Sequence, residues 1–209
     1  MTEAPAMIRV AIVDDHPVVR EGTAALLAGQ PGIAIAGTAG TLDEARVLAR
    51  RTDVDVLLLD IRMGTESGLH LLADAPAGDA HRPAIIVLTA YDYPQYAEAA
   101  LRLGAAGFVL KTAPMAELLD AIRRAAAGGL AFGVRPRADD RARLSPRELD
   151  VVRLVVDGRS NDEIGAGLGI GAKTVETHLA RLFERFGIAS RTELATRALR
   201  EGWLDLPPV

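Results

Sequence analysis

Five side chains that could carry out chemistry lie at the ends of short apolar runs. Asp14, Asp15 and Asp60 supply carboxylates, Thr89 supplies a hydroxyl and Lys111 supplies an ammonium. Carboxylates beside a hydroxyl and an ammonium are suited to phosphoryl transfer, a reaction that depends mostly on positioning and charge neutralisation. The residue types therefore predict a phosphoryl-transfer site, provided that the fold brings them together.

The apolar runs are typical of buried strands, and amphipathic segments separate them. Strands alternating with helices predict βαβ units, and hence an α/β doubly wound fold with a five-stranded parallel sheet of the flavodoxin type. Ligand sites of such sheets lie beyond the carboxyl ends of the strands, so the five side chains should converge there. The predicted strands cover residues 8–13, 33–36, 54–59, 85–88 and 108–110, and the predicted helices cover 17–28, 42–50, 66–75, 95–103 and 114–127.

Three neighbouring carboxylates repel one another, which raises their pKa values unless a cation is bound between them. Ligands that are all oxygen atoms suit Mg²⁺, which keeps several waters and bridges carboxylates to phosphates. In this interpretation Asp60 is the nucleophile that accepts phosphate. Lys111, the single lysine within residues 1–132, would pair with carboxylate and phosphoryl oxygens. A lone aspartate at a strand end is more often a turn former, so the hypothesis depends on the joint placement.

The segments VAIVDDHPVVREG, LLLDIRM, VLTAY and GFVLK resemble the receiver domain of bacterial response regulators across residues 7–130. The resemblance implies that Asp60 takes its phosphate from a phosphohistidine on a sensor histidine kinase. It also implies that Thr89 and Phe108 move together as a switch on phosphorylation. The Mg²⁺ ligands that it implies are Asp14, Asp15, Asp60 and the backbone carbonyl of Arg62.

Two positions depart from that family's common pattern. Gly64 stands where proline is common, and Thr112 stands where proline often follows the lysine. Gly64 should loosen the loop after the phosphorylation site, because glycine has more backbone freedom. A cis Lys111–Thr112 bond would cost about 2.5 to 4 kcal/mol, so a trans bond and a strained cis bond are both open. Neither departure removes a chemical group from the site.

The strand pattern ends before residue 133. We expect a receiver domain at 1–132, a linker at 133–143, where the sequence is polar and without apolar period, and a helical domain at 144–209. The helical domain should contain roughly four helices, because capping boxes open several short segments there. The predicted boxes pair Ser145 with Glu148, Ser160 with Glu163 and Ser190 with Glu193, and a further box in the receiver pairs Thr41 with Glu44.

The segments LSPRE, DGRSNDEI, TVETH and SRTELATRA between residues 144 and 198 resemble a LuxR-type helix-turn-helix. The domain order is similar to that of the NarL/FixJ family of response regulators. An apolar stripe at helical spacing, Val175, Leu179, Leu182, Phe183 and Phe186, should be core. The opposite face would approach DNA in the major groove. The DNA-binding residues predicted there are Lys173, Thr174, Glu176, Thr177 and Arg181.

Two residues of that face weaken the DNA prediction. The family often has lysine in place of Glu176 and polar or basic residues in place of Ala180. Glu176 could accept a hydrogen bond from a cytosine amino group or could repel phosphate. Residues 144–209 carry a net charge of -1, so a monomer should bind DNA weakly and with a shallow salt dependence.

We expect a homodimer on phosphorylation. Residues Leu194, Ala195, Ala198 and Leu199 of the last helix are interpreted equally well as its interface or as core.

Composition excludes several classes of function. The absence of cysteine excludes disulfides and thiolate metal sites, and no apolar run approaches the roughly 20 residues of a membrane span. We expect a cytoplasmic two-component response regulator, not an enzyme and without a membrane partner, in which phosphorylation of Asp60 controls promoter DNA binding and transcription. Two alternatives remain. A receiver could act through protein contacts with a helical domain that no longer reads DNA, or the chain could hydrolyse an outside phosphate ester, although Arg62 stands where such Asp-based phosphatases have a second aspartate.

Overall fold

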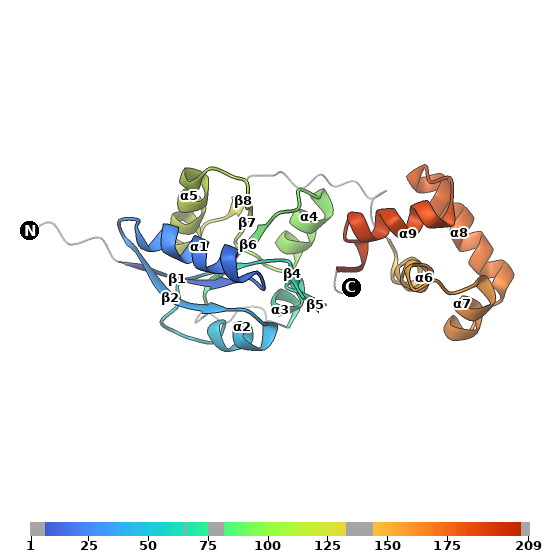
Figure 1. Ribbon diagram of the computed structural model, residues 1–209, viewed down its shortest axis with the longest axis horizontal. Coiled ribbons are helices and arrows are strands. Elements are labelled where there is room, and N and C mark those ends of the chain that lie inside the picture. Colours follow the sequence, from blue (N-terminus) through green and yellow to red (C-terminus); the bar gives the residue numbers. More distant parts are fainter. Residues whose placement is uncertain (1–6, 65, 75–81, 133–143, 206–209) are drawn as a thin grey trace, which may run out of the picture. The chain divides into compact units, whose positions relative to one another are not determined.

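The protein comprises two compact units, residues 1–137 and 138–209, which are described one at a time. The computed structural model describes residues 7–64, 66–74, 82–132 and 144–205 (Figure 1). The predicted linker, 133–143, lies outside the described residues.

The first unit is built on a parallel sheet with strand order β2-β1-β3-β6-β7-β8. The order reverses between β1 and β3, so this is a doubly wound sheet with a switch point between those two strands. The prediction of a doubly wound α/β fold is confirmed. The strands are β1 (Ile8–Val13), β2 (Ile33–Ala39), β3 (Val56–Leu59), β6 (Ala84–Thr89), β7 (Gly107–Leu110) and β8 (Ala131–Phe132).

Strand register brings the predicted site residues to one edge of the sheet. Val13 of β1 pairs with Leu59 of β3, so the residues that follow them, Asp14 and Asp60, leave adjacent strands at the same level. In the next pair, Thr89 at the end of β6 lies opposite Leu110 of β7. The switch point therefore lies where the carboxylates emerge.

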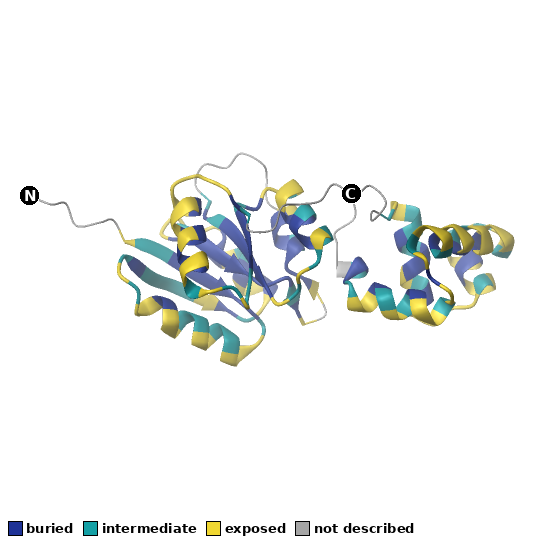
Figure 2. Cartoon of the chain, turned by 90° about the horizontal axis from the view of Figure 1, so that it is seen from above, coloured by how far each residue is buried: buried dark blue, intermediate teal, exposed yellow. Residues whose placement is uncertain are grey.

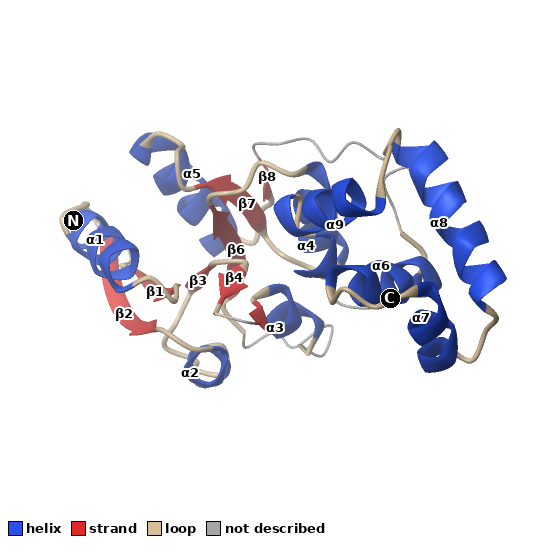
Figure 3. Cartoon of the chain, turned by 45° about the vertical axis from the view of Figure 1, so that its right-hand side comes forward, coloured by secondary structure: helices blue, strands red, loops and turns tan. Residues whose placement is uncertain are grey.

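Helices cover both faces of the sheet, and the central strands β3, β6 and β7 are mostly buried, whereas the edge strand β2 is only partly buried (Figures 2 and 3). On one face, Val10 and Ile12 of β1 pack in a cluster with Leu27 of α1 and Ile122 of α5. The buried cluster makes the sheet a rigid base for the loops at its edge. The helices are α1 (Pro17–Ala28), α2 (Leu42–Leu48), α3 (Leu69–Ala73), α4 (Pro94–Arg102) and α5 (Met115–Ala126).

The sheet has six strands where the sequence predicts five. The additional strand, β8, pairs in parallel with β7, and the N–H of Ala131 donates to the carbonyl of Ala106 at 2.7 Å. The backbone of β8 comes so close to Gly107 that a Cβ there would lie 2.6 Å from the Ala131 carbonyl oxygen. Two residues are too few to show the alternating pattern of a strand, so the sequence does not reveal β8.

A short hairpin follows the phosphorylation-site candidate Asp60. Strands β4 (Arg62–Met63) and β5 (Glu66–Ser67) pair in antiparallel fashion, and Gly64 between them has φ +65°. The helix predicted to begin at residue 66 therefore begins only at Leu69. Glycine adopts this left-handed conformation readily and proline cannot, so the backbone at Gly64 differs from any that the family's common proline could adopt.

The second unit, within its described residues, consists of helices and confirms the prediction of a compact helical domain. The apolar stripe of α8 faces the core: Val175, Leu179 and Leu182 are buried, and Phe183 and Phe186 pack against them. Trp203 packs on Phe186 with ring centroids 4.6 Å apart. The elements are α6 (Pro146–Val156), α7 (Asn161–Leu168), α8 (Ala172–Phe186), α9 (Arg191–Arg200) and a 3₁₀ helix at Trp203–Asp205.

All four predicted caps accept a hydrogen bond on the Ser or Thr side chain, but only two are complete boxes. Ser145 with Glu148 and Ser160 with Glu163 exchange both hydrogen bonds. At the other two helices the glutamate accepts from the residue before the cap instead. These acceptors are Glu44, bonded by the Gly40 N–H, and Glu193, bonded by the Ala189 N–H.

Candidate functional site

The three carboxylates predicted from the sequence converge at the switch point of the sheet. One oxygen from each of Asp14, Asp15 and Asp60, together with a ring nitrogen of His16, lies within 4.8 Å of the others. Asp14 and Asp60 are buried, with 2% and 4% of their surface exposed, whereas Asp15 is partly exposed. Buried carboxylates this close together disfavour being charged at the same time unless cations balance them.

Lys111 supplies one such cation. Its ammonium lies 2.6 Å from Asp14 Oδ2 and 2.7 Å from Asp60 Oδ2, so it bridges the two buried carboxylates. Burial by itself would lower the pKa of Lys111, but its hydrogen bonds to the two carboxylates outweigh burial and raise that pKa. Lys111 therefore remains charged, and its bond to Thr112 is trans, as are all peptide bonds of the described residues.

The charge of Asp60 is disfavoured in the folded protein. Burial raises its pKa, the proximity of Asp14 raises it further, and the ion pair with Lys111 offsets only part of the increase. Its Oδ1 accepts a hydrogen bond from the Ile61 N–H at 2.8 Å, which orients the carboxylate. Three carboxylates and one ammonium leave two negative charges in excess, which a divalent cation would neutralise.

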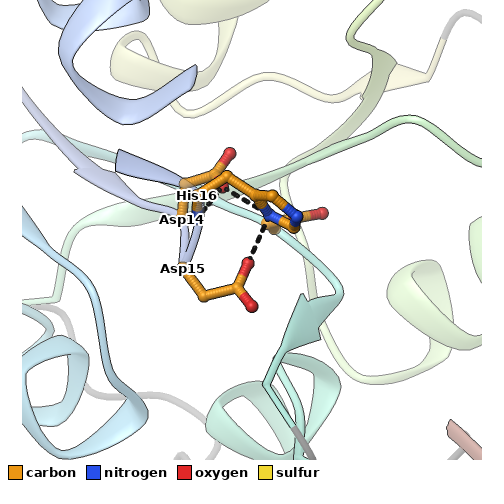
Figure 4. Close-up of side chains that lie close together, drawn as sticks. Asp14, Asp15 and His16 are labelled. Carbon is orange, nitrogen blue, oxygen red and sulfur yellow. Dashed lines mark hydrogen bonds and ion pairs between the residues drawn. The ribbon is translucent and has the colours of Figure 1, made fainter. Parts of the chain in front are cut away.

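Two residues that the sequence did not single out support this cluster. The His16 ring nitrogen Nδ1 lies 2.6 Å from Asp15 Oδ1 and 3.5 Å from Asp14 Oδ1 (Figure 4). The Arg20 guanidinium donates to the backbone carbonyl of Asp14 at 2.6 Å. His16 could have been found from its position directly after the aspartate pair. Arg20 gives no comparable signal, because its contact depends on how α1 packs.

The predicted switch residues lie in the adjacent strands β6 and β7, two positions apart in register. Thr89 is fully buried at the end of β6, and its Oγ1 accepts a hydrogen bond from the Tyr91 N–H at 3.3 Å. Phe108 is buried in β7 and pairs with Val87, two residues before Thr89. The Arg62 guanidinium lies over the Tyr91 ring, 4.8 Å from its centroid, so the loops after β3 and β6 are in contact.

The predicted DNA-binding face of α8 is exposed along its length. Lys173 and Glu176 form an ion pair of 2.8 Å, and hydrogen bonding to Glu176 raises the pKa of Lys173. The Thr177 hydroxyl donates to the Lys173 carbonyl at 3.0 Å. Charge on this face is thus partly neutralised within the helix. The exposed residues include all five of the prediction, Lys173, Thr174, Glu176, Thr177 and Arg181.

The residues of the last helix differ in burial, so core positions can be distinguished from possible interface positions one by one. Leu194 and Ala198 of α9 are fully buried in the helical core, and Ala195 packs partly against it. Leu199 is 54% exposed. The core interpretation therefore holds for Leu194 and Ala198, and an interface could use only the side of α9 that includes Leu199.

Within the described part of the chain, no helix is both long enough and apolar enough to cross a bilayer. 

Sequence comparison matches both parts of the chain to known families. Residues 10–123 match the response regulator receiver domain, and residues 142–198 match the bacterial regulatory proteins of the luxR family. The chain is 37% identical to the transcriptional regulatory protein UhpA of Salmonella typhimurium over 201 residues, covering 94% of this chain and 100% of that protein. It is also 37% identical to the nitrate/nitrite response regulator NarP of Escherichia coli, covering 88% and 90%.

Solved structures agree with this match. RcsB from Salmonella enterica serovar Typhimurium, bound to the promoter P1flhDC with the phosphomimetic BeF₃⁻, aligns with a TM-score of 0.66 and 26% identity over 93% of this chain and 98% of that chain. The response regulator ChrA of a heme-sensing two-component system aligns with a TM-score of 0.54 and 30% identity over 94% and 98%. The chain is therefore a response regulator and belongs to the family in which a receiver domain is followed by a LuxR-type DNA-binding domain.

Proposed function

We propose that Asp60 accepts a phosphoryl group from a phosphohistidine of a sensor histidine kinase, and that this modification controls promoter binding. The observation that carries the proposal is the buried Asp60 carboxylate, paired with Lys111 at 2.7 Å at the switch point of the sheet. In the reaction one Asp60 oxygen forms a bond to phosphorus, and the P–N bond to the kinase histidine breaks. The electron pair of that bond stays on the imidazole, whose other ring nitrogen carries a proton, so the ring leaves as neutral histidine.

The residues present fit a resident Mg²⁺ ion. One oxygen of each of the three aspartates and a His16 ring nitrogen lie within 4.8 Å of one another. The buried Asp15 Oδ1 accepts no hydrogen bond within the described residues, although the His16 Nδ1 lies 2.6 Å away. When bound, Mg²⁺ would neutralise charge on the carboxylates and on the incoming phosphoryl group. The groups that we propose as its ligands are the carboxylates of Asp14, Asp15 and Asp60 and the backbone carbonyl of Arg62.

Two further side chains would hold the phosphoryl group once it is transferred. Lys111 already bridges Asp14 and Asp60, and its ammonium can exchange a carboxylate oxygen for a phosphoryl oxygen. Thr89 uses its Oγ1 as an acceptor for the Tyr91 N–H, so its hydroxyl hydrogen can be donated to the phosphoryl group. Movement of Thr89 toward the phosphate would open space beside Phe108, which lies in the adjacent strand.

The output of the switch is DNA binding by α8. The phosphoryl group carries roughly -1.5 to -2 charges and replaces the single charge of the Asp60 carboxylate, and this change would favour a homodimer that joins two half-sites. DNA-bound RcsB is among the structural relatives, which supports the same output here. With a kinase and a promoter as its partners, we propose that the chain acts in the cytoplasm. The DNA contacts that we propose are Lys173, Thr174, Glu176, Thr177 and Arg181.

Labelling by acetyl phosphate with Mg²⁺ tests the phosphoacceptor. The full chain should gain one phosphoryl group, measured by intact mass spectrometry, and Asp60→Asn should gain none. Asp53→Asn is the matched control, because Asp53 is exposed and pairs with Arg51 away from the cluster. Continued labelling of Asp60→Asn would refute the assignment.

A second candidate function is a receiver that acts through protein contacts while its helical domain reads no sequence. The ion pair between Lys173 and Glu176 favours it, since it removes free positive charge from the DNA face. Selection from a random DNA pool, with and without phosphorylation, separates the two candidates, because only a sequence reader enriches a motif. We expect no turnover of outside phosphate esters, because Arg62 supplies no second carboxylate two residues after Asp60.

A further inference from the structure

Gly64 contacts the acidic cluster through its backbone. Its N–H donates a hydrogen bond of 2.8 Å to Asp15 Oδ2, across 49 positions of sequence. The contact depends on the turn between β4 and β5, where Gly64 has φ +65°. Proline at this position would lack the donor and could not adopt that φ.

Asp15 is the member of the cluster that most needs such a contact. Asp14 and Asp60 are buried and held by Lys111, whereas the Asp15 side chain is 25% exposed. With Oδ2 held by Gly64, the other oxygen, Oδ1, is buried and lies 2.6 Å from the His16 ring nitrogen. The Gly64 hydrogen bond therefore orients Asp15 from one oxygen, while the His16 ring contacts the other.

We propose that the Gly64 amide is a positioning group for divalent cation binding at Asp15. This inference rests on the proposed Mg²⁺ site. A hydrogen bond to a carboxylate favours its ionised form and removes the cost of ordering it when the cation binds. A charge-assisted hydrogen bond of this kind corresponds to roughly a tenfold change in affinity at the lower end of its range.

The chain allows the amide to be removed or retained at the same position. Gly64→Pro deletes the donor, whereas Gly64→Asn keeps it and tolerates a positive φ. A Cβ at this position meets no atom within 4 Å, so the Cβ of asparagine has room there. Combining each variant with Asp15→Asn shows whether the proline acts through Asp15 or by disturbing the loop in general.

Calorimetric titration of the unphosphorylated full chain with MgCl₂ is the test. We expect Gly64→Pro to weaken Mg²⁺ binding about tenfold, Gly64→Asn to stay within about twofold of the wild type, and the proline effect to disappear in the Asp15→Asn background. A proline variant that binds like the wild type, or an equal proline effect without the Asp15 carboxylate, would overturn the inference. Wild-type protein that binds no Mg²⁺ would instead overturn the metal site itself.

A second measurement does not depend on the folding of the proline variant. In ¹⁵N-labelled full-length protein, the Gly64 amide should exchange with solvent more slowly in the wild type than in Asp15→Asn, and its proton resonance should move upfield in that variant. Unchanged exchange and chemical shift would show that the contact does not form in solution, and would overturn the inference.

Discussion

Lys111→Met should destabilise the receiver by leaving two buried carboxylates without a counter-charge. The substitution keeps an unbranched side chain and removes the ammonium that lies 2.6 Å from Asp14 and 2.7 Å from Asp60. Two unit charges 4.8 Å apart, the limiting distance within the cluster, repel by about 3.5 kcal/mol at an effective dielectric constant of about 20. We therefore expect the free energy of unfolding to fall by about 3 to 4 kcal/mol at pH 7 without Mg²⁺, as for other broken buried ion pairs.

Urea unfolding of the full chain in EDTA, followed by far-UV circular dichroism, measures this loss. Trp203, the single tryptophan of the chain, is buried in the helical unit, so its fluorescence reports that unit separately. The matched control is Lys173→Met, which removes the other lysine. Lys173 is exposed, and its loss should leave the receiver transition unchanged.

Mg²⁺ and acid should both reverse the effect of Lys111→Met. At tenfold its dissociation constant, a ligand stabilises the folded state by about 1.4 kcal/mol. The variant should gain more than the wild type at equal Mg²⁺ concentration, because the ammonium no longer repels the cation. The pKa of Asp60 is raised in the folded protein, so lowering the pH through that pKa protonates Asp60 and increases stability. If Lys111→Met lowered the free energy of unfolding by the same amount in the Asp60→Asn background as in the wild type, the electrostatic reasoning would be refuted.

Three further predictions concern the sheet edge and the helical unit. Gly107→Ala should cost about 1 to 3 kcal/mol of receiver stability in urea, because its Cβ would collide with the carbonyl of the facing residue in β8; an unchanged midpoint would contradict the β8 pairing. Glu176→Lys should release Lys173 and steepen the salt dependence of DNA binding by about 0.9 per added phosphate contact, measured by fluorescence anisotropy; an unchanged slope would exclude phosphate contacts at this face. Burial alone would raise the pKa of Glu148, but its hydrogen bonds with Ser145 outweigh burial and lower that pKa. The stability that the charged Glu148 contributes is therefore present above the ordinary carboxyl pKa and is lost as the pH falls through the pKa of the folded state. Glu148→Gln should therefore cost about 1 kcal/mol at pH 7 and little in acid, followed by Trp203 fluorescence, and a cost independent of pH would contradict the linkage.

The sequence was sufficient for the doubly wound fold and for the convergence of Asp14, Asp15, Asp60 and Lys111. Each of these residues directly follows or ends an apolar run, and parallel strands bring their carboxyl ends to one edge whatever the details of packing. The core stripe of α8 was equally predictable, because helical period and burial coincide there. Such features depend on the local pattern of apolar and polar residues, so a single sequence is enough to predict them.

The tertiary structure decided what depends on backbone approach between distant segments. Two contacts leave no pattern in the sequence: the hydrogen bond from Gly64 to Asp15 and the pairing of β8 with β7. The first requires a particular turn, and the second requires two distant segments of the backbone to lie close together. The pairing of Lys111 with both Asp14 and Asp60 likewise follows from strand register, which sets the distances between their side chains. Sequence thus determined which chemical groups reach the edge of the sheet, and tertiary structure determined which of them neutralise and orient one another, because those energies depend on separations of a few ångströms.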